Sequence, residues 1–238
     1  MRNAIITGGS GGIGKACARA LAERGYDVVL CARREEALRA AAAEVGARYV
    51  VADVGDPESF SAVTRDVGRI DLVVHAAGVL GGTYARKQSL EQWRATLAAN
   101  LDSCFVVTSA ALPLMVPGSR FVFVSSSASH EPMPGRTAYS ASKAGMNAFA
   151  RALALEVDRD GIAVHIVTPG PVETDMLQDV PFEMNAVSAL DVADAVAWLD
   201  TVVPSVALPE IRLHAVTRGP WARPPVVPSE VRRRAAQS

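Results

Sequence analysis

The fold of this chain is decided by residues 3–14, Asn3-Ala4-Ile5-Ile6-Thr7-Gly8-Gly9-Ser10-Gly11-Gly12-Ile13-Gly14. A short β-rich run leads straight into glycines, and a helical pattern begins at Ile13. Glycines permit a tight turn and let the backbone approach a pyrophosphate, and the free N–H groups of a helix N-terminus attract negative charge. This order of strand, glycine turn and helix is the context that a dinucleotide-binding fingerprint requires.

A second stretch carries acid–base chemistry, Tyr139-Ser140-Ala141-Ser142-Lys143. The tyrosine and the lysine are four residues apart, so on a helix they share one face, one turn apart. A phenol has a pKa of about 10 and is a poor acid–base catalyst at neutral pH. We expect the Lys143 ammonium to favour the phenolate and so to lower the pKa of Tyr139. The pair is therefore interpreted as a proton donor for a carbonyl reduction.

Short β-rich runs alternate with helical patterns along the chain. Such alternation predicts repeated βαβ units and a single Rossmann-like α/β domain, with helices on both faces of a doubly wound parallel sheet. Capping signals support two of the helices, Asp56 before Pro57 and Ser89 three residues before Gln92. The expected strands are residues 3–7, 27–31, 48–51, 72–75, 120–125, 163–168 and 210–214, and the expected helices are residues 13–24, 35–44, 57–67, 90–114, 139–160 and 191–199.

Composition excludes several classes of protein. Half of the 238 residues are hydrophobic, which excludes disorder as the main state. The 24 Lys and Arg residues nearly balance the 25 Asp and Glu residues, so no nucleic-acid partner is expected. Three scattered cysteines, Cys17, Cys31 and Cys104, support neither a disulfide framework nor a zinc site, and no other metal is expected.

The expected compartment is a reducing cytoplasm, with no membrane partner. The apolar run Ile5-Ile6 is too short for a signal peptide, and no apolar stretch is expected to approach membrane-spanning length. We expect residues 1–218 to form one dinucleotide-binding and catalytic domain. Residues 219–238 hold four prolines and three consecutive arginines, and they predict an extended C-terminal tail. That tail is interpreted either as a solvated terminus or as an arm that packs on a neighbouring subunit.

Taken together, the residues resemble the short-chain dehydrogenase/reductase family over positions 5–217. The glycine run matches as Thr7-Gly8-x-x-x-Gly12-Ile13-Gly14, and the helical pair matches as Tyr139-x-x-x-Lys143. One landmark departs from the family: His75 stands where an asparagine usually braces the central sheet, and we expect a core histidine with satisfied hydrogen bonds. The remaining landmarks follow in the family's order, namely Asp53-Val54, Ala76-Ala77-Gly78, Asn100, Ser126, Pro169-Gly170, Val172 and Thr174.

The resemblance implies a role for each matching residue. Tyr139 would exchange a proton with the carbonyl oxygen, Ser126 would donate a hydrogen bond to that oxygen, and Lys143 would also hold the nicotinamide ribose. Asn100 would support a water through which Lys143 exchanges protons with solvent. The implied catalytic set is Asn100, Ser126, Tyr139 and Lys143. The implied coenzyme contacts are Gly8, Ser10, Gly12, Ile13, Gly14, Arg33, Asp53, Val54, Ala77, Gly78, Tyr139, Lys143, Pro169, Gly170, Val172 and Thr174.

The end of the second strand indicates which coenzyme binds. NAD-specific relatives place an acidic residue there, whereas this chain has Ala32 followed by Arg33 and Arg34. An arginine can hold a 2′-phosphate with two hydrogen bonds, so we expect NADP(H) rather than NAD(H). Gly11, where many NADP-binding relatives carry a second basic residue, weakens this expectation. The alternative is that Arg33 and Arg34 are only the exposed start of the next helix.

The expected function is reversible reduction of a carbonyl to a secondary alcohol, on a small-molecule substrate. A short segment between Thr174 and Leu190 predicts a small lid over a fairly open cleft. Family members assemble as dimers or tetramers through the long helices that contain Asn100 and Tyr139, so a homodimer or homotetramer is expected. The residues expected to line the substrate end are His130, Met133, Pro134, Val79, Leu80, Met176, Leu177 and Met184, with Arg136 nearby.

Two other functions fit parts of the sequence. A coenzyme-binding regulatory or scaffold protein would keep the fold without turnover, but it would need few of the four catalytic residues. Residues 8–12 also satisfy the Gly-x-Ser-x-Gly pattern of a hydrolase, with Ser10 as nucleophile and His75, His130, His165 or His214 as base. The hydrolase is disfavoured because this turn would follow the first strand, with no earlier strands to build the hydrolase sheet and its oxyanion loop.

Overall fold

The computed structural model describes residues 1–65, 67–180, 183–203, 206–217, 222–223 and 225–226. They form one seven-stranded sheet in which every pairing is parallel and the order is β3-β2-β1-β4-β5-β6-β7. The predicted α/β architecture is therefore confirmed. The strands are β1 (Arg2–Thr7), β2 (Tyr26–Ala32), β3 (Arg48–Val51), β4 (Ile70–His75), β5 (Met115–Val124), β6 (Ala163–Pro169) and β7 (Glu210–Leu213).

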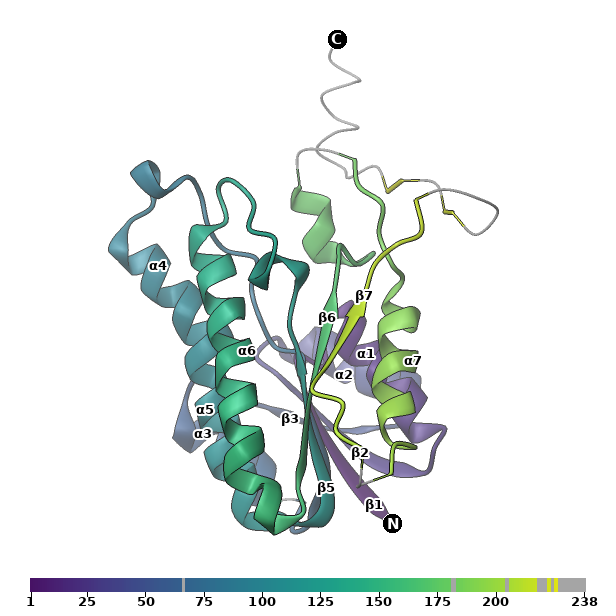
Figure 1. The fold of residues 1–238 in the computed structure, drawn as a ribbon. Helices are drawn as coiled ribbons and strands as arrows, with labels where there is room; N and C mark the ends of the chain where they lie inside the picture. Colours follow the sequence, from purple (N-terminus) through teal and green to yellow (C-terminus); the bar gives the residue numbers. More distant parts are fainter. Residues whose placement is uncertain (66, 181–182, 204–205, 218–221, 224, 227–238) are drawn as a thin grey trace.

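Helices cover both faces of the sheet, as Figure 1 shows. One face carries α1 (Gly12–Ala22), α2 (Glu35–Val45) and α7 (Ala189–Leu199). The other carries α3 (Pro57–Arg65), α5 (Ser103–Ala111) and α6 (Thr137–Val157), with α4 (Leu90–Leu97) leading into α5. A π-helix (Ala98–Asp102) joins α4 to α5, and the short 3-10 helices are Ala85–Lys87, Leu112–Leu114, Ser127–Ser129, Asp158–Asp160 and Asp175–Asp179.

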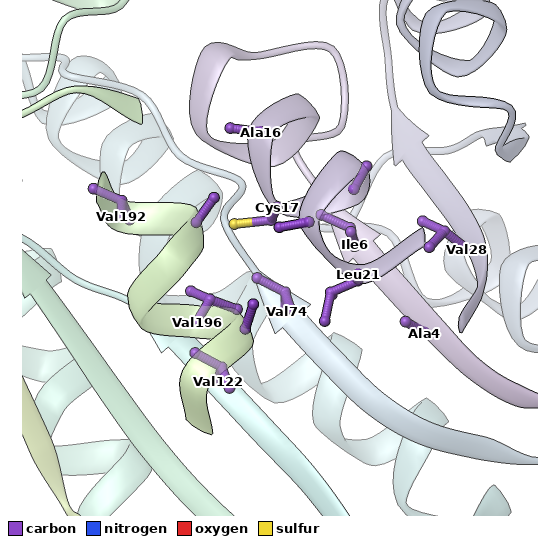
Figure 2. Packing of buried hydrophobic residues seen from close by; sticks show 14 of the residues in the cluster. Ala4, Ile6, Ala16, Cys17, Leu21, Val28, Val74, Val122, Val192 and Val196 are labelled. Carbon is purple, nitrogen blue, oxygen red and sulfur yellow. The ribbon is translucent and has the colours of Figure 1, made fainter. Parts of the chain in front are cut away.

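The two hydrophobic cores explain why strand sequences are apolar throughout. Every residue of β4 is buried, because helices pack on both of its faces. Figure 2 shows the first core, where Leu21 of α1 and Val196 of α7 pack over Ile6 and Val74 of the sheet. On the opposite face, the second core includes Phe60, Phe121, Phe123, Met146 and Leu153. Both cores consist of closely packed apolar side chains from the sheet and its helices, so they hold the strand ends in fixed positions.

Local signals behave as predicted at the helix starts. The Ser89 hydroxyl accepts from the Gln92 N–H at 3.1 Å, and the Gln92 side chain accepts from the Ser89 N–H at 3.0 Å, which completes a capping box. The Asp56 carboxylate accepts from the Glu58 N–H at 3.1 Å. The largest difference is β5, which begins at Met115 rather than at residue 120. Pro117 and Gly118 hid this strand, because both residue types are poor strand formers.

The expectation that no apolar stretch approaches membrane-spanning length is wrong. The continuous helical segment Leu90–Leu114 is long and apolar enough to cross a membrane. Core helices of water-soluble proteins meet the same criteria, and this segment buries Asn100 and Ser103 against the rest of the fold. The predicted tail from residue 219 lies mostly outside the described residues. Within it, Val226 pairs with Met184 in an isolated antiparallel bridge.

Candidate active site

A cavity of about 1290 Å³ opens at the carboxyl ends of the strands. The strand order reverses between β1 and β4, and such a switch point is where ligands bind in open α/β sheets. The volume exceeds the roughly 300–1,000 Å³ of most ligand pockets, so it has room for a dinucleotide beside a substrate. The predicted residues that line it are Gly8, Ser10, Gly12, Ile13, Gly14, Arg33, Asp53, Val54, Ala77, Gly78, Ser126, Tyr139, Pro169, Val172 and Thr174.

The glycine turn at one end of the cavity has no space for side chains. Gly8 has φ +69, and a Cβ there would lie 2.7 Å from the carbonyl oxygen of Ala76. A Cβ on Gly14 would collide with the Gly8 carbonyl, so the turn and the start of α1 lie against each other. No side chain caps the N-terminus of α1, where Gly11 is the N-cap. The free N–H groups of this helix end therefore face an opening suited to a phosphate.

Arg33 and Asp53 lie side by side in the lining of the next part of the cavity. Both side chains are at least half exposed, and the Arg33 Nη1 atom lies 3.9 Å from the Asp53 Oδ2 atom. Ion pairs between solvent-exposed side chains contribute little to stability, so the Arg33 guanidinium is available to a ligand. Asp53 itself is oriented by its own loop, because its Oδ1 atom accepts from the Gly55 N–H at 2.9 Å.

Tyr139 lies at the wall of the same cavity, near the start of α6. Burial raises the pKa of its phenol, and a hydrogen bond with Ser126 opposes that rise. Ser126 follows β5, and its hydroxyl also accepts from the Ala128 N–H at 3.2 Å. Of the three neighbouring serines at 125–127, Ser126 is thus the one in contact with the phenol.

Lys143 does not act on Tyr139 as the sequence predicted. Its Nζ atom lies 6.0 Å from the Tyr139 ring centroid and donates to the Val124 carbonyl at 2.9 Å. Burial lowers the pKa of Lys143 to about 8. The groups that lower the pKa of Tyr139 are Ser126 and Arg136, and burial outweighs both. The expected lowering of the phenol pKa by Lys143 is therefore wrong for the ligand-free site.

Asn100 sits in the π-helix and fixes the loop after β4. Its Oδ1 atom accepts from the Val79 N–H at 2.7 Å, and its Nδ2 atom donates to the Val79 carbonyl at 3.0 Å and to the Ser142 hydroxyl at 3.0 Å. Neither Asn100 nor Lys143 lines the cavity directly. Both lie behind Gly78, where a Cβ would be 3.1 Å from Asn100 Oδ1 and 3.6 Å from Lys143 Nζ. The missing side chain of Gly78 brings the cavity close to the buried ammonium.

Two further residues singled out from the sequence, Gly170 and His75, lie outside the cavity lining. Gly170 does not line the cavity, because its N–H donates to the Leu213 carbonyl at 2.8 Å and joins it to β7. His75 is fully buried, and its two ring nitrogens contact Thr7 and Ser103, as expected of a satisfied core histidine. Burial lowers the pKa of His75 to about 3.

The substrate end of the cavity is mostly apolar. Val79, Leu80, Met133, Pro134, Met176, Leu177 and Met184 line it as expected, and Arg136 also reaches the wall. Tyr84 lines it too, and the sequence reasoning missed it because it lies in an irregular segment without periodicity. His130 is not part of the wall: its Nε2 atom pairs with Glu210 at 2.7 Å. Three of the histidines considered as a hydrolase base bond elsewhere, His75 to Thr7, His130 to Glu210 and His165 to the Leu208 carbonyl.

Comparisons with known proteins agree with this geometry. The model of the family described as short chain dehydrogenase matches residues 2–185. The 3-oxoacyl-[acyl-carrier-protein] reductase of Bos taurus is 35% identical over 210 residues, covering 82% of this chain and 89% of that protein. A variant of actinorhodin polyketide ketoreductase with NADPH superposes with a TM-score of 0.83 at 30% identity, covering 90% of this chain and 95% of the other.

A second solved structure, BdcA in complex with NADPH, has a TM-score of 0.82 at 27% identity and covers 90% of this chain and 93% of the other. The match of the family model spans strands β1 to β6, the glycine turn and the helix that bears Tyr139 and Lys143. The match of the family model to more than three quarters of the sequence agrees with the parallel sheet and with the cavity at its switch point. The chain belongs to the short-chain dehydrogenase family of oxidoreductases.

Proposed function

We propose that this oxidoreductase uses NADP(H) to interconvert a carbonyl and a secondary alcohol. The observation that carries the proposal is the contact between the Tyr139 phenol and Ser126 on the wall of the cavity. Lys143 and Asn100 lie directly behind that wall. A phenol, a hydroxyl and a buried ammonium around one opening suit a reaction in which an oxygen gains and loses a proton.

The residues of the cavity fit a dinucleotide. The crowded glycine turn leaves no side chain between the cavity and the start of α1, and Gly12 is so close to Thr174 that a Cβ would lie 2.8 Å from its Cγ2 atom. Gly8, Ser10, Gly12, Ile13 and Gly14 would hold the pyrophosphate. Asp53 and Val54 would hold the adenine, and Ala77, Gly78, Pro169, Val172 and Thr174, braced by Gly170, would hold the nicotinamide half. When bound, the coenzyme supplies or accepts the hydride.

Protonation of the side chains suits the direction of reduction. Burial raises the pKa of Tyr139, so at neutral pH the phenol carries the proton that it would give to the substrate oxygen. Ser126 would donate a hydrogen bond to the same oxygen and keep it in place. Ser126 and Arg136 would stabilise the phenolate that remains, and Lys143 would contact the ribose through the gap at Gly78. Asn100 would hold the loop after β4 and connect Lys143 to solvent.

Arg33 supports NADP(H) over NAD(H). Its guanidinium is mostly exposed at the cavity, and no acidic residue stands at the end of β2, where Ala32 is the last residue. A guanidinium can hold a 2′-phosphate with two parallel hydrogen bonds. The two NADPH complexes among the similar structures are consistent with this preference. The wall at the substrate end favours a neutral, apolar ketone.

The decisive experiment replaces Tyr139→Phe, which removes the proton and little else. We expect kcat for NADPH-dependent reduction of a panel of neutral ketones to fall by roughly 10²–10⁴-fold, because a positioned acid contributes about that much. Coenzyme binding, followed by NADPH fluorescence, should be retained. Tyr49→Phe removes the same hydroxyl from β3, away from the cavity, and serves as the control. Undiminished turnover in Tyr139→Phe would sink the proposed mechanism.

The same measurement separates the enzyme from a coenzyme-binding scaffold. A scaffold would bind NADPH and would turn over none of the ketones, with or without Tyr139. The placement of Ser126 beside Tyr139 in the cavity wall favours the enzyme, because binding alone does not require a hydroxyl next to the phenol.

A further inference from the structure

His75 forms a buried link between two parts of the candidate active site. The side chain ends β4 and is fully buried, with its ring against Phe123 at a centroid distance of 5.9 Å. Its Nδ1 atom lies 3.0 Å from the Thr7 hydroxyl, and its Nε2 atom lies 3.2 Å from the Ser103 hydroxyl. His75 does not line the cavity, so whatever it does for the site passes through these two neighbours.

The hydrogen bonds of the neighbours determine where the ring proton sits. The Ser103 hydroxyl donates its only proton to the Ala99 carbonyl at 2.9 Å. Ser103 can therefore only accept from His75, which places a proton on Nε2. Burial and the Lys143 charge hold the pKa of His75 near 3, so the ring is neutral and carries one proton. The Nδ1 atom is left as an acceptor, and the Thr7 hydroxyl donates to it.

This chain of hydrogen bonds ends at the backbone of two segments of the candidate site, the glycine turn with the loop after β4 and the π-helix. Thr7 immediately precedes the glycine turn, and its hydroxyl accepts from the Ala77 N–H at 3.1 Å, next to Gly78. Ala99 belongs to the π-helix that carries Asn100. Ser103 follows Ala99 by four residues, and its hydroxyl bonds back to the Ala99 carbonyl of the π-helix. One imidazole thus spans the distance between the coenzyme end and the Asn100 end of the site.

We propose that His75 is a positioning residue which, with its single ring proton on Nε2, sets the spacing between the glycine turn and the π-helix that carries Asn100. An imidazole is rigid and offers one donor and one acceptor in opposite directions, so the spacing is specified without a water. The kinetic part of this inference rests on the proposed carbonyl reduction. The assignment of the ring proton does not.

The first test is a nitrogen-15 spectrum of the intact protein labelled at histidine, at pH 7. Replacing His130, His165 and His214 one at a time assigns the remaining signals to His75. We expect a neutral ring with its proton on Nε2, coupled to Nδ1 as an unprotonated nitrogen. A ring protonated on Nδ1, or on both nitrogens, would overturn the proposal. This result does not depend on turnover, so it stands even if the proposed function fails.

The second test breaks the link at its far end. Ser103→Ala removes the acceptor of the Nε2 proton and the donor to Ala99, and we expect kcat to fall by roughly tenfold or more, because small displacements of catalytic groups have large effects. The dissociation constant for NADPH should change by less than about threefold, because Thr7 and the glycine turn keep their contacts. Ser103→Thr retains a hydroxyl and should restore most of kcat.

Ser109→Ala is the matched control for this second test. Ser109 lies on the same helix and also donates to a carbonyl of that helix, at 3.1 Å from Val106, but it has no contact with His75. Equal kcat values for Ser103→Ala and Ser109→Ala would refute the positioning role. If Ser103→Ala does not fold, the nitrogen spectrum of the unaltered protein still decides the ring proton. Absence of turnover in the unaltered protein would count against the proposed function and not against that assignment.

Discussion

Arg33 is the residue that carries the proposed preference for NADP(H). Arg33→Ala should weaken NADPH binding and leave NADH binding nearly unchanged, because only NADPH has the 2′-phosphate. The measurement is the thermal unfolding midpoint with each coenzyme. A ligand at about 100 times its dissociation constant adds roughly 2.7 kcal/mol to the free energy of unfolding, which raises the midpoint by several degrees. Arg39→Ala, an exposed residue of α2 that does not line the cavity, is the control, and an unchanged NADPH shift in Arg33→Ala would contradict the prediction.

Lys143 makes stability depend on pH in a defined window. Burial lowers its pKa in the folded protein from 10.5 to about 8. Between pH 8 and 10.5 the unfolded chain holds this proton and the folded protein does not, so this group makes the folded state more stable as pH rises. Its contribution should amount to roughly 3 kcal/mol across the window.

The contribution of Lys143 to the free energy of unfolding is measured by comparing Lys143→Met with the unaltered protein. Urea unfolding at pH 7.5 and pH 10 should show that Lys143→Met loses this pH-dependent gain, and Lys87→Met, on the exposed surface, should keep it. Other groups titrate in the same range, and the comparison cancels them. Parallel pH curves for Lys143→Met and the unaltered protein would show that Lys143 is not buried as a free base.

Residue types and spacing predicted Tyr139 and Lys143 as a pair, whereas Asn100 and Ser126 followed only from the family resemblance. Tyr139 and Lys143 are one turn apart on α6, and Gly8 and Gly14 frame a strand-to-helix turn. The protonation of Tyr139 could not be predicted, because its pKa depends on how deeply the fold buries the phenol. The role of Gly78 was also hidden, since the closeness of Asn100 and Lys143 behind it arises only in the tertiary structure.

At the scale of elements, the turn between β1 and α1 depends on Gly8. Gly8→Ala should destabilise the protein and abolish NADPH binding, because the new Cβ would strain a backbone with φ +69 and press on the Ala76 carbonyl. Gly25→Ala is a matched control: Gly25 has φ +80 in the turn after α1, with no atom within 4 Å of its Cβ position. It should lose about 1–2 kcal/mol and keep its coenzyme affinity. Equal coenzyme affinities in the two variants would contradict the prediction, and circular dichroism would confirm that both fold.

Hydrophobic periodicity predicted the order and the type of the helices and strands. It did not predict the π-helix or the early start of β5. The segment Leu90–Leu114 was predicted as one helix, but nothing in its sequence marked the π-helix at Ala98–Asp102. A π-helix is stabilised by contacts elsewhere, here by the hydrogen bonds of Asn100 with Val79 and Ser142. The early start of β5 was missed for a similar reason, since Ser119 bonds the Ile70 carbonyl across the sheet.

At the scale of the whole molecule, the long helices carry an exposed apolar surface. Phe105 of α5 and Leu155 of α6 are 64% and 82% exposed in the single chain. We expect these helices to pair between subunits, and light scattering should give the mass of a dimer or a tetramer. Phe105→Glu should reduce that mass. Trp198→Glu, on the separate helix α7, is the comparison, and a one-chain mass for the unaltered protein would refute the assembly.

The order of the strands in the sheet bears on how the chain is made. The first four strands to leave the ribosome end at His75. They lie next to one another in the sheet, in the order β3-β2-β1-β4, and can pair before the rest of the chain is made. After that, β5, β6 and β7 join one after another at the same edge, in the order of synthesis. Each newly synthesised strand therefore finds its partner already in place, and no finished strand has to be displaced. The wall of the cavity is complete once the lining residues after β6, which end at Met184, have emerged, before β7 is made.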